Sequence, residues 1–196
     1  MYKSIYVDDS KIKYKDKIYQ LNIAFNRMLK AIDLTEDNTI GEADKIELMF
    51  NCFVDEKVKL NLMDKGQIVN KIFKHLDSFF ESKKNSKKEK VMDLKSDFEY
   101  IYSSFYKDYN IDLLEQVDKL SWIKFIALLN GLSKDTKLSE VIKIRTMEIP
   151  KPTKDNHKYR QSLIEQKNFY ALENEKEDFQ EGLNDLFNIL SGMSKK

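Results

Sequence analysis

The spacing of apolar residues along the chain predicts a protein that is mainly helical. Along most of its length apolar side chains recur at steps of three and four residues, which places them on one face of a helix. Polar and charged residues fill the positions between them, as expected for helices that bury one side. The predicted stripes are Phe25, Met28, Leu29 and Ile32; Ile46, Met49, Phe50 and Phe53; Ile68, Ile72, Leu76 and Phe79; Leu138, Val141, Ile142 and Arg145; and Tyr159, Leu163 and Tyr170.

Residues 97–132 are the most apolar part of the chain and hold its single tryptophan. Between residues 120 and 132 apolar side chains fill nearly every position, with Lys124 and Asn130 as the exceptions. A helix without a polar face must be covered on most sides, so we expect a central buried helix here. The run is shorter than the roughly 20 apolar residues that a membrane-spanning helix needs.

An aromatic helix is predicted just before this central helix, over residues 97–109. Asn110 tolerates a left-handed conformation and is expected to end it, and Gly131 is expected to end the central helix. Helices joined by a short link usually pack antiparallel, so the aromatic stripe would cover the central helix. The predicted core of this region is Phe98, Ile101, Tyr102, Phe105, Trp122, Phe125, Ile126 and Leu129.

The beginning of the chain predicts a small β-hairpin over residues 4–21. Residues 5–7 are the expected first strand, residues 8–10 the turn and residues 12–21 the return, within which residues 16–17 could form another turn. A two-stranded hairpin is marginally stable alone, so it must dock on helices or on another copy of the protein. Its edge could add a strand from a partner, or its lysines could guard against such pairing.

Several helix starts are predicted from side chains that can accept a hydrogen bond from the first helical turn. Thr39 followed by Glu42 has the spacing of a capping box. The other predicted caps are Asn22, Asp64, and either Asp135 or Thr136.

Residues 82–90 form the clearest break in the chain, with five lysines and no apolar residue. We favour a solvated linker over a phosphate-contacting loop, because no aromatic side chain is interleaved for base stacking. The predicted organisation is a domain over residues 1–172, made of the hairpin and the helices with this basic loop. Residues 173–196 follow as a polar joint and an amphipathic helix.

The predicted C-terminal helix is the candidate protein-binding element. Its polar joint allows it either to bind a partner or to pack back on its own body, and both alternatives stay open. Its apolar stripe is Phe179, Leu183, Leu186, Phe187 and Leu190.

The composition of the chain limits the classes of function that it can have. The 196 residues carry a net charge of +1, which argues against a dedicated nucleic-acid binder, since such proteins have a marked basic excess. The one cysteine, Cys52, excludes a disulfide within the chain and is expected to be a small buried hydrophobe rather than a reactive thiol. With no signal sequence or membrane span recognised, we expect a protein of the cytoplasm.

No arrangement of residues indicates catalysis. The sequence has no glycine-rich phosphate loop and no nucleophile elbow. His75 and His157 lack metal-ligand spacing to each other or to Cys52, so we expect both on helix surfaces. We therefore predict no enzyme activity, no catalytic, cofactor-binding or metal-binding residues and no cofactor.

The aromatic and tryptophan-containing segments also carry a distinctive pattern, which covers about residues 2–172 and is strongest over residues 93–172. Its residues are Ile101, Tyr102, Phe105, Tyr109, Ile111, Asp112, Leu113, Leu120, Trp122, Phe125, Leu128, Leu129, Gly131, Leu132, Thr136, Ile142, Arg145, Lys167, Tyr170 and Leu172. The pattern resembles a family of small siphophage tail proteins, encoded near the tape-measure gene in phages and prophages of Gram-positive bacteria. This chain departs from the family pattern at Ile123, because members of the family often have a second aromatic residue beside the tryptophan.

The resemblance implies a non-enzymatic tail assembly chaperone that keeps the tape-measure protein soluble. Other tail assembly proteins and further copies of this chain are possible additional partners, with neither nucleic acid nor membrane involved. It further implies a protein of the bacterial host cytoplasm that is absent from the mature virion. The alternatives are a structural minor tail component retained in the virion and a nucleic-acid-binding regulator.

Overall fold

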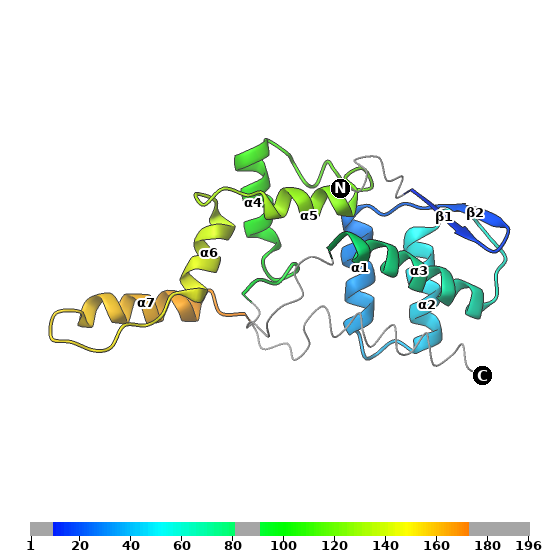
Figure 1. Ribbon diagram of the computed structural model, residues 1–196. Coiled ribbons are helices and arrows are strands. Elements are labelled where there is room, and N and C mark those ends of the chain that lie inside the picture. Colours follow the sequence, from blue (N-terminus) through cyan, green and yellow to red (C-terminus); the bar gives the residue numbers. More distant parts are fainter. Residues whose placement is uncertain (1–9, 81–90, 173–196) are drawn as a thin grey trace. The chain divides into compact units, whose positions relative to one another are not determined.

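The computed structural model describes residues 10–80 and 91–172, and the side chains among them other than those of residues 77–80. It is mainly helical with a two-stranded antiparallel hairpin near the N-terminus, which confirms the predicted fold class (Figure 1). The contacts divide the chain into two compact units. The first unit contains the described residues up to 80 and Val117–Phe125, and the second contains residues 91–116 and 126–172.

The first unit is built around three helices and the hairpin. Helix α2 packs against both α1 and α3, and the hairpin lies on α3 through β1. The elements are β1 (Lys11–Tyr14), β2 (Lys17–Gln20), α1 (Phe25–Glu36), α2 (Glu42–Phe53) and α3 (Leu62–Phe80).

The second unit is centred on α6, which packs against both α4 and α7. The helix α5 begins in the first unit and ends in the second. The bounds are α4 (Phe98–Tyr109), α5 (Trp122–Asn130), α6 (Lys137–Thr146) and α7 (His157–Phe169).

The hairpin differs from the prediction in its register. The stretch predicted as a single return strand forms both strands of the hairpin. The chain reverses at residues 15–16, and Tyr14 pairs with Lys17. Lys15 adopts a left-handed conformation with φ of 52°, a turn geometry that the sequence does not signal because neither glycine nor asparagine occupies the position. The expected first strand, residues 5–7, lies outside the described residues.

The core of the first unit confirms the stripes predicted for α1 and α2 at most positions. Phe25, Met28 and Ile32 are buried in α1, and Ile46, Met49, Phe50 and Phe53 are buried in α2. The start of α5 joins this core through an antiparallel bridge between Ala24 and Ser121. Phe125 stacks on both Phe25 and Trp122, at ring-centroid distances of 5.1 and 5.6 Å.

The prediction that α5 is buried on nearly all sides is wrong. Trp122, Phe125 and Leu129 are buried, but Ile123 and Ile126 are only half-buried and Ala127 is exposed. These positions describe a helix with one buried face and a half-covered flank. The sequence could not show this, since apolar residues on a helix do not by themselves indicate how many neighbours surround it.

The predicted antiparallel pairing of the aromatic helix with the tryptophan helix is also wrong. The chief helix partner of α4 is α6, and residues 111–121, which include a series of turns at 113–119, form a longer connection rather than a short link. Ser104 explains the close approach of α6, because its side chain is fully buried and its Oγ accepts a hydrogen bond from the N–H of Leu138 at 3.1 Å.

The two predicted helix ends have different physical causes. Asn110 caps α4 in the left-handed conformation, with φ of 53°, as predicted. Gly131 follows α5 as predicted, but none of the described glycines has a positive φ. A Cβ at Gly131 would come within 3.0 Å of the Tyr109 hydroxyl, which donates to the carbonyl of Leu128. The close approach of the Tyr109 hydroxyl therefore explains the glycine at position 131 better than its backbone conformation does.

The predicted helix starts are right at one position and wrong at three. Thr136 caps α6 through its side chain, whereas Gly41 precedes α2 and Thr39 donates to Asp37 instead. The remaining two starts are displaced along the chain: α1 begins after Ala24 rather than Asn22, and the side chain of Asn61, not Asp64, accepts at the start of α3.

Replacing Trp122 by alanine tests the placement of α5 in the core. Because the indole is only 3% exposed and stacked on Phe125, we expect Trp122→Ala to lower the free energy of unfolding by about 3–5 kcal/mol in urea titrations. Tyr106→Ala, at an exposed position of α4, is the matched control and should change it by less than about 0.5 kcal/mol. Equal effects of the two substitutions would contradict this packing.

Candidate functional site

A buried ion pair lies at the centre of the second unit. Asp97, just before α4, is 1% exposed and accepts two hydrogen bonds from the guanidinium of Arg145 in α6. The two N–O distances are 2.6 and 2.7 Å, so the pair has the parallel bidentate geometry in which arginine binds carboxylates most strongly. Asp97 also accepts from the backbone N–H of Asp93 at 2.9 Å. The pair thus joins the beginning of α4 to the end of α6.

The residue that follows α7, Tyr170, joins the same cluster. The Nε of Arg145 donates to the carbonyl of Tyr170 at 2.5 Å, and the ammonium of Lys137 donates to the Tyr170 hydroxyl at 2.8 Å. The Tyr170 ring also contacts Tyr100 of α4 edge-on, with ring centroids 5.9 Å apart. One tyrosine therefore touches α4 and both ends of α6.

Lys167 of α7 completes the contact between α6 and α7. Its ammonium donates to the carbonyls of Ile144, Arg145 and Met147, at the C-terminal end of α6. Carbonyls at the end of a helix lack the partners four residues further on and carry the negative end of the helix dipole, so a cation is favourable there. The three bonds use all three N–H groups of the ammonium.

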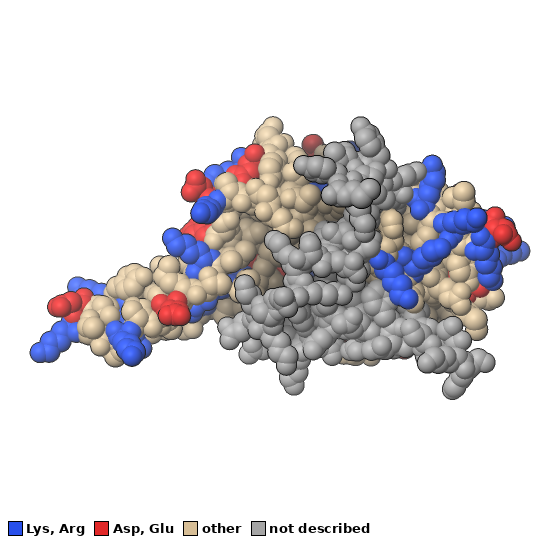
Figure 2. Space-filling model, viewed as in Figure 1, with Lys and Arg blue, Asp and Glu red and all other residues tan. Residues whose placement is uncertain are grey.

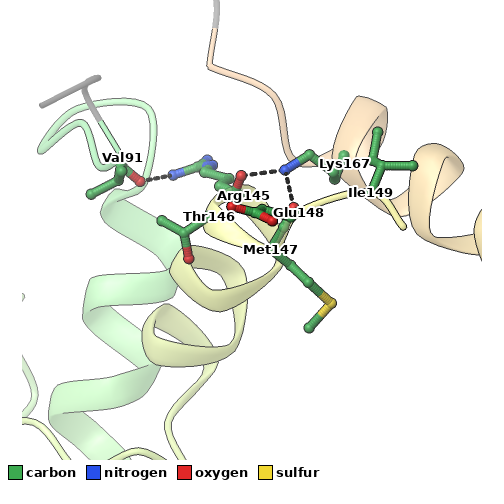
Figure 3. Close-up of a pocket in the computed structure, with 7 residues that line it drawn as sticks. All are labelled: Val91, Arg145, Thr146, Met147, Glu148, Ile149 and Lys167. Carbon is green, nitrogen blue, oxygen red and sulfur yellow. Dashed lines mark hydrogen bonds between the residues drawn. The ribbon is translucent and has the colours of Figure 1, made fainter. Parts of the chain in front are cut away.

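A hollow of about 530 Å³ lies beside this cluster (Figure 3). Arg145 and Lys167 line it, yet both cations turn their N–H groups to acceptors of the chain itself. Arg145 donates to Asp97 and to the carbonyls of Val91 and Tyr170, and Lys167 donates to three carbonyls. The positive charges are therefore already engaged in holding the fold, and the hollow shows no group arranged to receive an anion.

Removing the charge of Asp97 tests the importance of the pair. Asp97→Asn leaves a buried guanidinium without its counter-ion, so we expect a loss of about 3–5 kcal/mol in the free energy of unfolding. The control is Glu140→Gln, which breaks the exposed pair with Lys137 and should cost less than about 1 kcal/mol. Urea unfolding followed by circular dichroism measures both, and similar losses would show that the buried pair has no special role.

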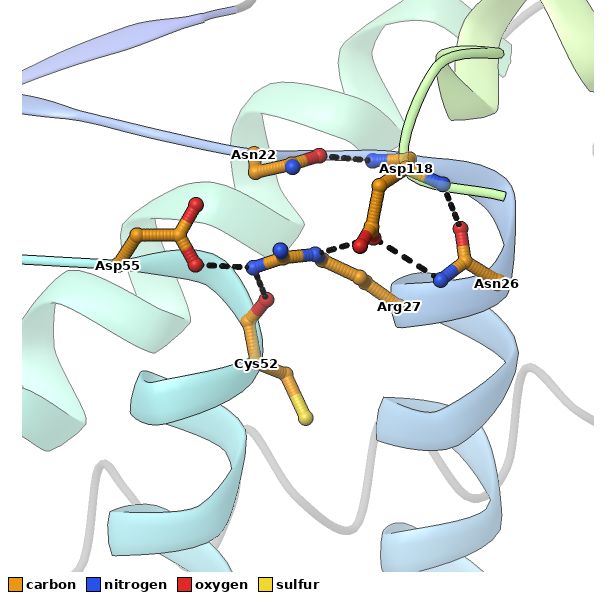
Figure 4. A network of polar contacts seen from close by, with 7 residues as sticks. Asn22, Asn26, Arg27, Cys52, Asp55 and Asp118 are labelled. Atoms are coloured by element: carbon orange, nitrogen blue, oxygen red, sulfur yellow. Dashed lines mark hydrogen bonds and ion pairs between the residues drawn. The ribbon is translucent and has the colours of Figure 1, made fainter. Parts of the chain in front are cut away.

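A second polar network lies in the first unit and centres on Arg27 of α1 (Figure 4). Its Nε donates to Asp118 at 2.6 Å, and one terminal nitrogen donates to Asp55 and to the carbonyl of Cys52. Asn26 and Asp118 exchange two hydrogen bonds of 3.0 Å, one through the backbone N–H of Asp118. Together these contacts hold Asp118 in a left-handed conformation with φ of 59°.

The network shifts the pKa values of its members. The hydrogen bond to Asp118 raises the pKa of Arg27, and the bonds from Arg27 and Asn26 lower the pKa of Asp118 below the usual carboxyl value. A carboxyl group whose pKa is lowered by folding stabilises the protein above its unfolded pKa, and this stabilisation disappears as the pH falls through the folded pKa.

The pH dependence of stability tests this assignment. In the wild type the free energy of unfolding should fall as the pH drops below about 4, partly because Asp118 becomes protonated. Asp118→Asn should be less stable at pH 7 and show a shallower fall below that pH. Asp155→Asn, at an exposed position, is the control and should follow the wild-type curve. A wild-type pH profile for Asp118→Asn would rule out this contribution.

Apolar side chains are exposed around α7. Phe169 is 77% exposed at the end of the helix, and Tyr159 and Ile149 are exposed as well. Leu163 is the one residue of α7 that is buried. A helix that buries one residue and exposes large apolar ones offers contact area to another surface.

The residues weighed for chemistry show little sign of it in the described ranges. Cys52 is buried, and burial raises the pKa of its thiol, which disfavours the reactive thiolate. His75 is half-buried and His157 is exposed at the start of α7. Within residues 10–80 and 91–172, no group of three or more His, Cys, Asp or Glu side chains is placed to hold a metal ion. No helix among these residues has the length and apolar content to cross a membrane.

The predicted site residues fall into two groups. The candidate protein-binding stripe, Phe179, Leu183, Leu186, Phe187 and Leu190, lies outside the described residues, as does the basic segment 82–90. The predicted core residues are all described. Ile101, Phe105, Trp122, Phe125 and Leu129 are buried, whereas Phe98, Tyr102 and Ile126 are half-buried.

Sequence reasoning found part of the polar cluster without recognising it. Arg145, Lys167 and Tyr170 belong to the pattern that carries the family resemblance, but spacing alone assigned Arg145 to a helix stripe. The partner Asp97 appeared only as the first residue of the aromatic helix. A charged residue in an apolar stripe, as at Arg145, was the available signal, because such a position requires a buried counter-ion.

Comparison with known proteins identifies the chain as a bacteriophage protein. The model of the family described as bacteriophage Gp15 protein matches residues 7–172. This range covers most of the chain, which therefore belongs to the bacteriophage Gp15 family. No curated protein and no solved structure matches. The phage part of the resemblance is confirmed, and the membership points to a structural or assembly protein of the phage.

Proposed function

We propose that this protein is a non-enzymatic tail assembly chaperone that binds the tape-measure protein and keeps it soluble until the tail tube surrounds it. The observation that carries the proposal is membership of a bacteriophage family across residues 7–172. A tape-measure protein is expected to be long and helical, with apolar stripes that would aggregate if left uncovered.

The polar chemistry of the described residues supports a binding role. The cations of the second unit, Arg145 and Lys167, are engaged by carboxylate and carbonyl groups of the same chain. Such groups stabilise a scaffold and are not displayed for a substrate. Binding would then depend on apolar surface, which the chain offers at Phe169 and Tyr159.

The sequence beyond α7 contains further apolar residues. Phe169 is followed ten residues later by Phe179, the first member of the predicted C-terminal stripe. A partner with repeated apolar segments could engage many copies of the chaperone, and weak repeated contacts give avidity while each remains reversible. Reversibility matters because assembling tube subunits must displace the chaperone.

Co-expression with the neighbouring tape-measure protein tests the proposal. We expect the tape-measure protein to become soluble and to co-purify with several copies of this chain. A tape-measure protein that stays insoluble while this chain folds would contradict the chaperone role. Detection of the chain in purified virions would instead support the alternative, a minor tail component.

Charged substitutions in the C-terminal stripe locate the binding surface. Leu186→Asp with Leu190→Asp should leave the helical content unchanged by circular dichroism and reduce the co-purified tape-measure protein at least tenfold, because it places charges in an apolar contact. Asn184→Asp with Asn188→Asp adds the same charge at polar positions and should bind like the wild type. Unfolding of the leucine variant would show that the stripe belongs to the core instead.

A further inference from the structure

The outward face of the hairpin combines lysines with an exposed isoleucine. Side chains alternate between the two faces of a strand, and the pairing of Lys11 with Gln20 and of Lys13 with Ile18 puts these four on one face. All four are exposed, and Ile18 is 67% exposed. The opposite face is turned inward, since Ile12 and Tyr19 are buried.

Helix α3 extends this basic surface. The Tyr14 hydroxyl shares its hydrogen between Asp64 and Gln67, and Lys71 donates to the carbonyl of Lys13 at 2.6 Å, so β1 runs along this stripe of α3. Lys74, three residues further, continues the stripe and is exposed. Figure 2 shows Lys and Arg side chains gathered over the hairpin. We call the surface formed by Lys11, Lys13, Ile18, Lys71 and Lys74 the lysine face.

The complementary charge occurs in the same sequence, near its end. The chain as a whole is close to neutral, with a net charge of +1, so its basic residues are matched in number by acidic residues. Between residues 173 and 185 one lysine stands among six carboxylates, and the apolar stripe that begins at Phe179 runs through the same segment. The carboxylates are Glu173, Glu175, Glu177, Asp178, Glu181 and Asp185.

We propose that the lysine face is the docking surface for the acidic segment 173–196 of this chain. Carboxylates of the segment would pair with Lys11 and Lys13, and in the free protein its apolar stripe would cover Ile18 until the tape-measure protein displaces it. Opposite charge selects the segment from solution, and the contact with Ile18 adds apolar burial that charge alone does not provide. A chain of this length reaches up to about 80 Å when extended, so its length does not limit the contact.

Zero-length crosslinking of the full chain tests the contact directly. A carbodiimide activates a carboxylate, and a touching lysine amine then forms an amide with net loss of one water. Mass spectrometry should find Lys11 or Lys13 joined to a carboxylate of residues 173–185, within one chain or between two copies. The ion pair of Lys15 with Asp64 is the internal standard. If that standard forms but the segment joins only lysines of residues 83–90, or none, the proposal is wrong.

Charge reversal in the full chain provides the second test. Lys11→Glu with Lys13→Glu should speed amide hydrogen exchange in residues 173–196 by about twofold to thirtyfold, the range expected when two exposed ion pairs are lost. Lys57→Glu with Lys59→Glu makes the same charge change at exposed positions after α2 and should leave that exchange unchanged. Adding Glu177→Lys and Glu181→Lys to the first variant should restore the slow exchange.

Identical exchange in the wild type and the Lys11→Glu, Lys13→Glu variant would overturn the proposal. If that variant also loses binding to a short DNA duplex at 0.15 M salt, the lysine face is assigned to nucleic acid instead. This result does not depend on whether the tape-measure protein is the partner, so this inference and the proposed function can fail separately.

Discussion

The second unit depends on the burial of one carboxylate against one guanidinium. Asp97 and Arg145 are far apart in sequence and come from the start of one helix and the end of another, so neither end can shift without leaving a charge unpaired in the interior. The same guanidinium fixes the residue after α7 through the carbonyl of Tyr170. Apolar packing gives this unit its core, while the ion pair determines which helix ends meet.

The fold class was predictable because helix periodicity is a local signal, and the main errors concern contacts that are not local. The predictions that Asn110 ends α4 and that Thr136 caps α6 were correct, because a left-handed cap and a side-chain cap depend on a few adjacent residues. The predicted partner of α4 was wrong because the short buried side chain of Ser104 allows α6 to approach, and no periodic pattern indicates this. The hairpin turn was placed at residues 8–10, and the second possible turn, at residues 16–17, lay one residue too late, because Lys15 takes a conformation that its residue type does not favour.

The polar cluster of the second unit shows how much of the candidate site the sequence contained. Arg145, Lys167 and Tyr170 were visible as members of a family pattern, but their roles depend on carbonyl groups, which no sequence motif describes. Lys167 acts at the end of a helix other than its own. The pattern that identifies the family is therefore, at these positions, a pattern of helix-end contacts, which explains how it can specify a fold without specifying a reaction.

The left-handed residues of the described chain carry a consequence for the order in which structure can form. Lys15, Asn110 and Asp118 have side chains where glycine would be easier to accommodate, at a cost of about 1–2 kcal/mol for an ordinary residue. Lys15 and Asp118 are held there by contacts 49 and 91 residues distant in sequence. Lysine has no local preference for this conformation, and aspartate has only a modest one. We therefore expect both bends to become stable only as the helices that carry Asp64 and Arg27 dock against them.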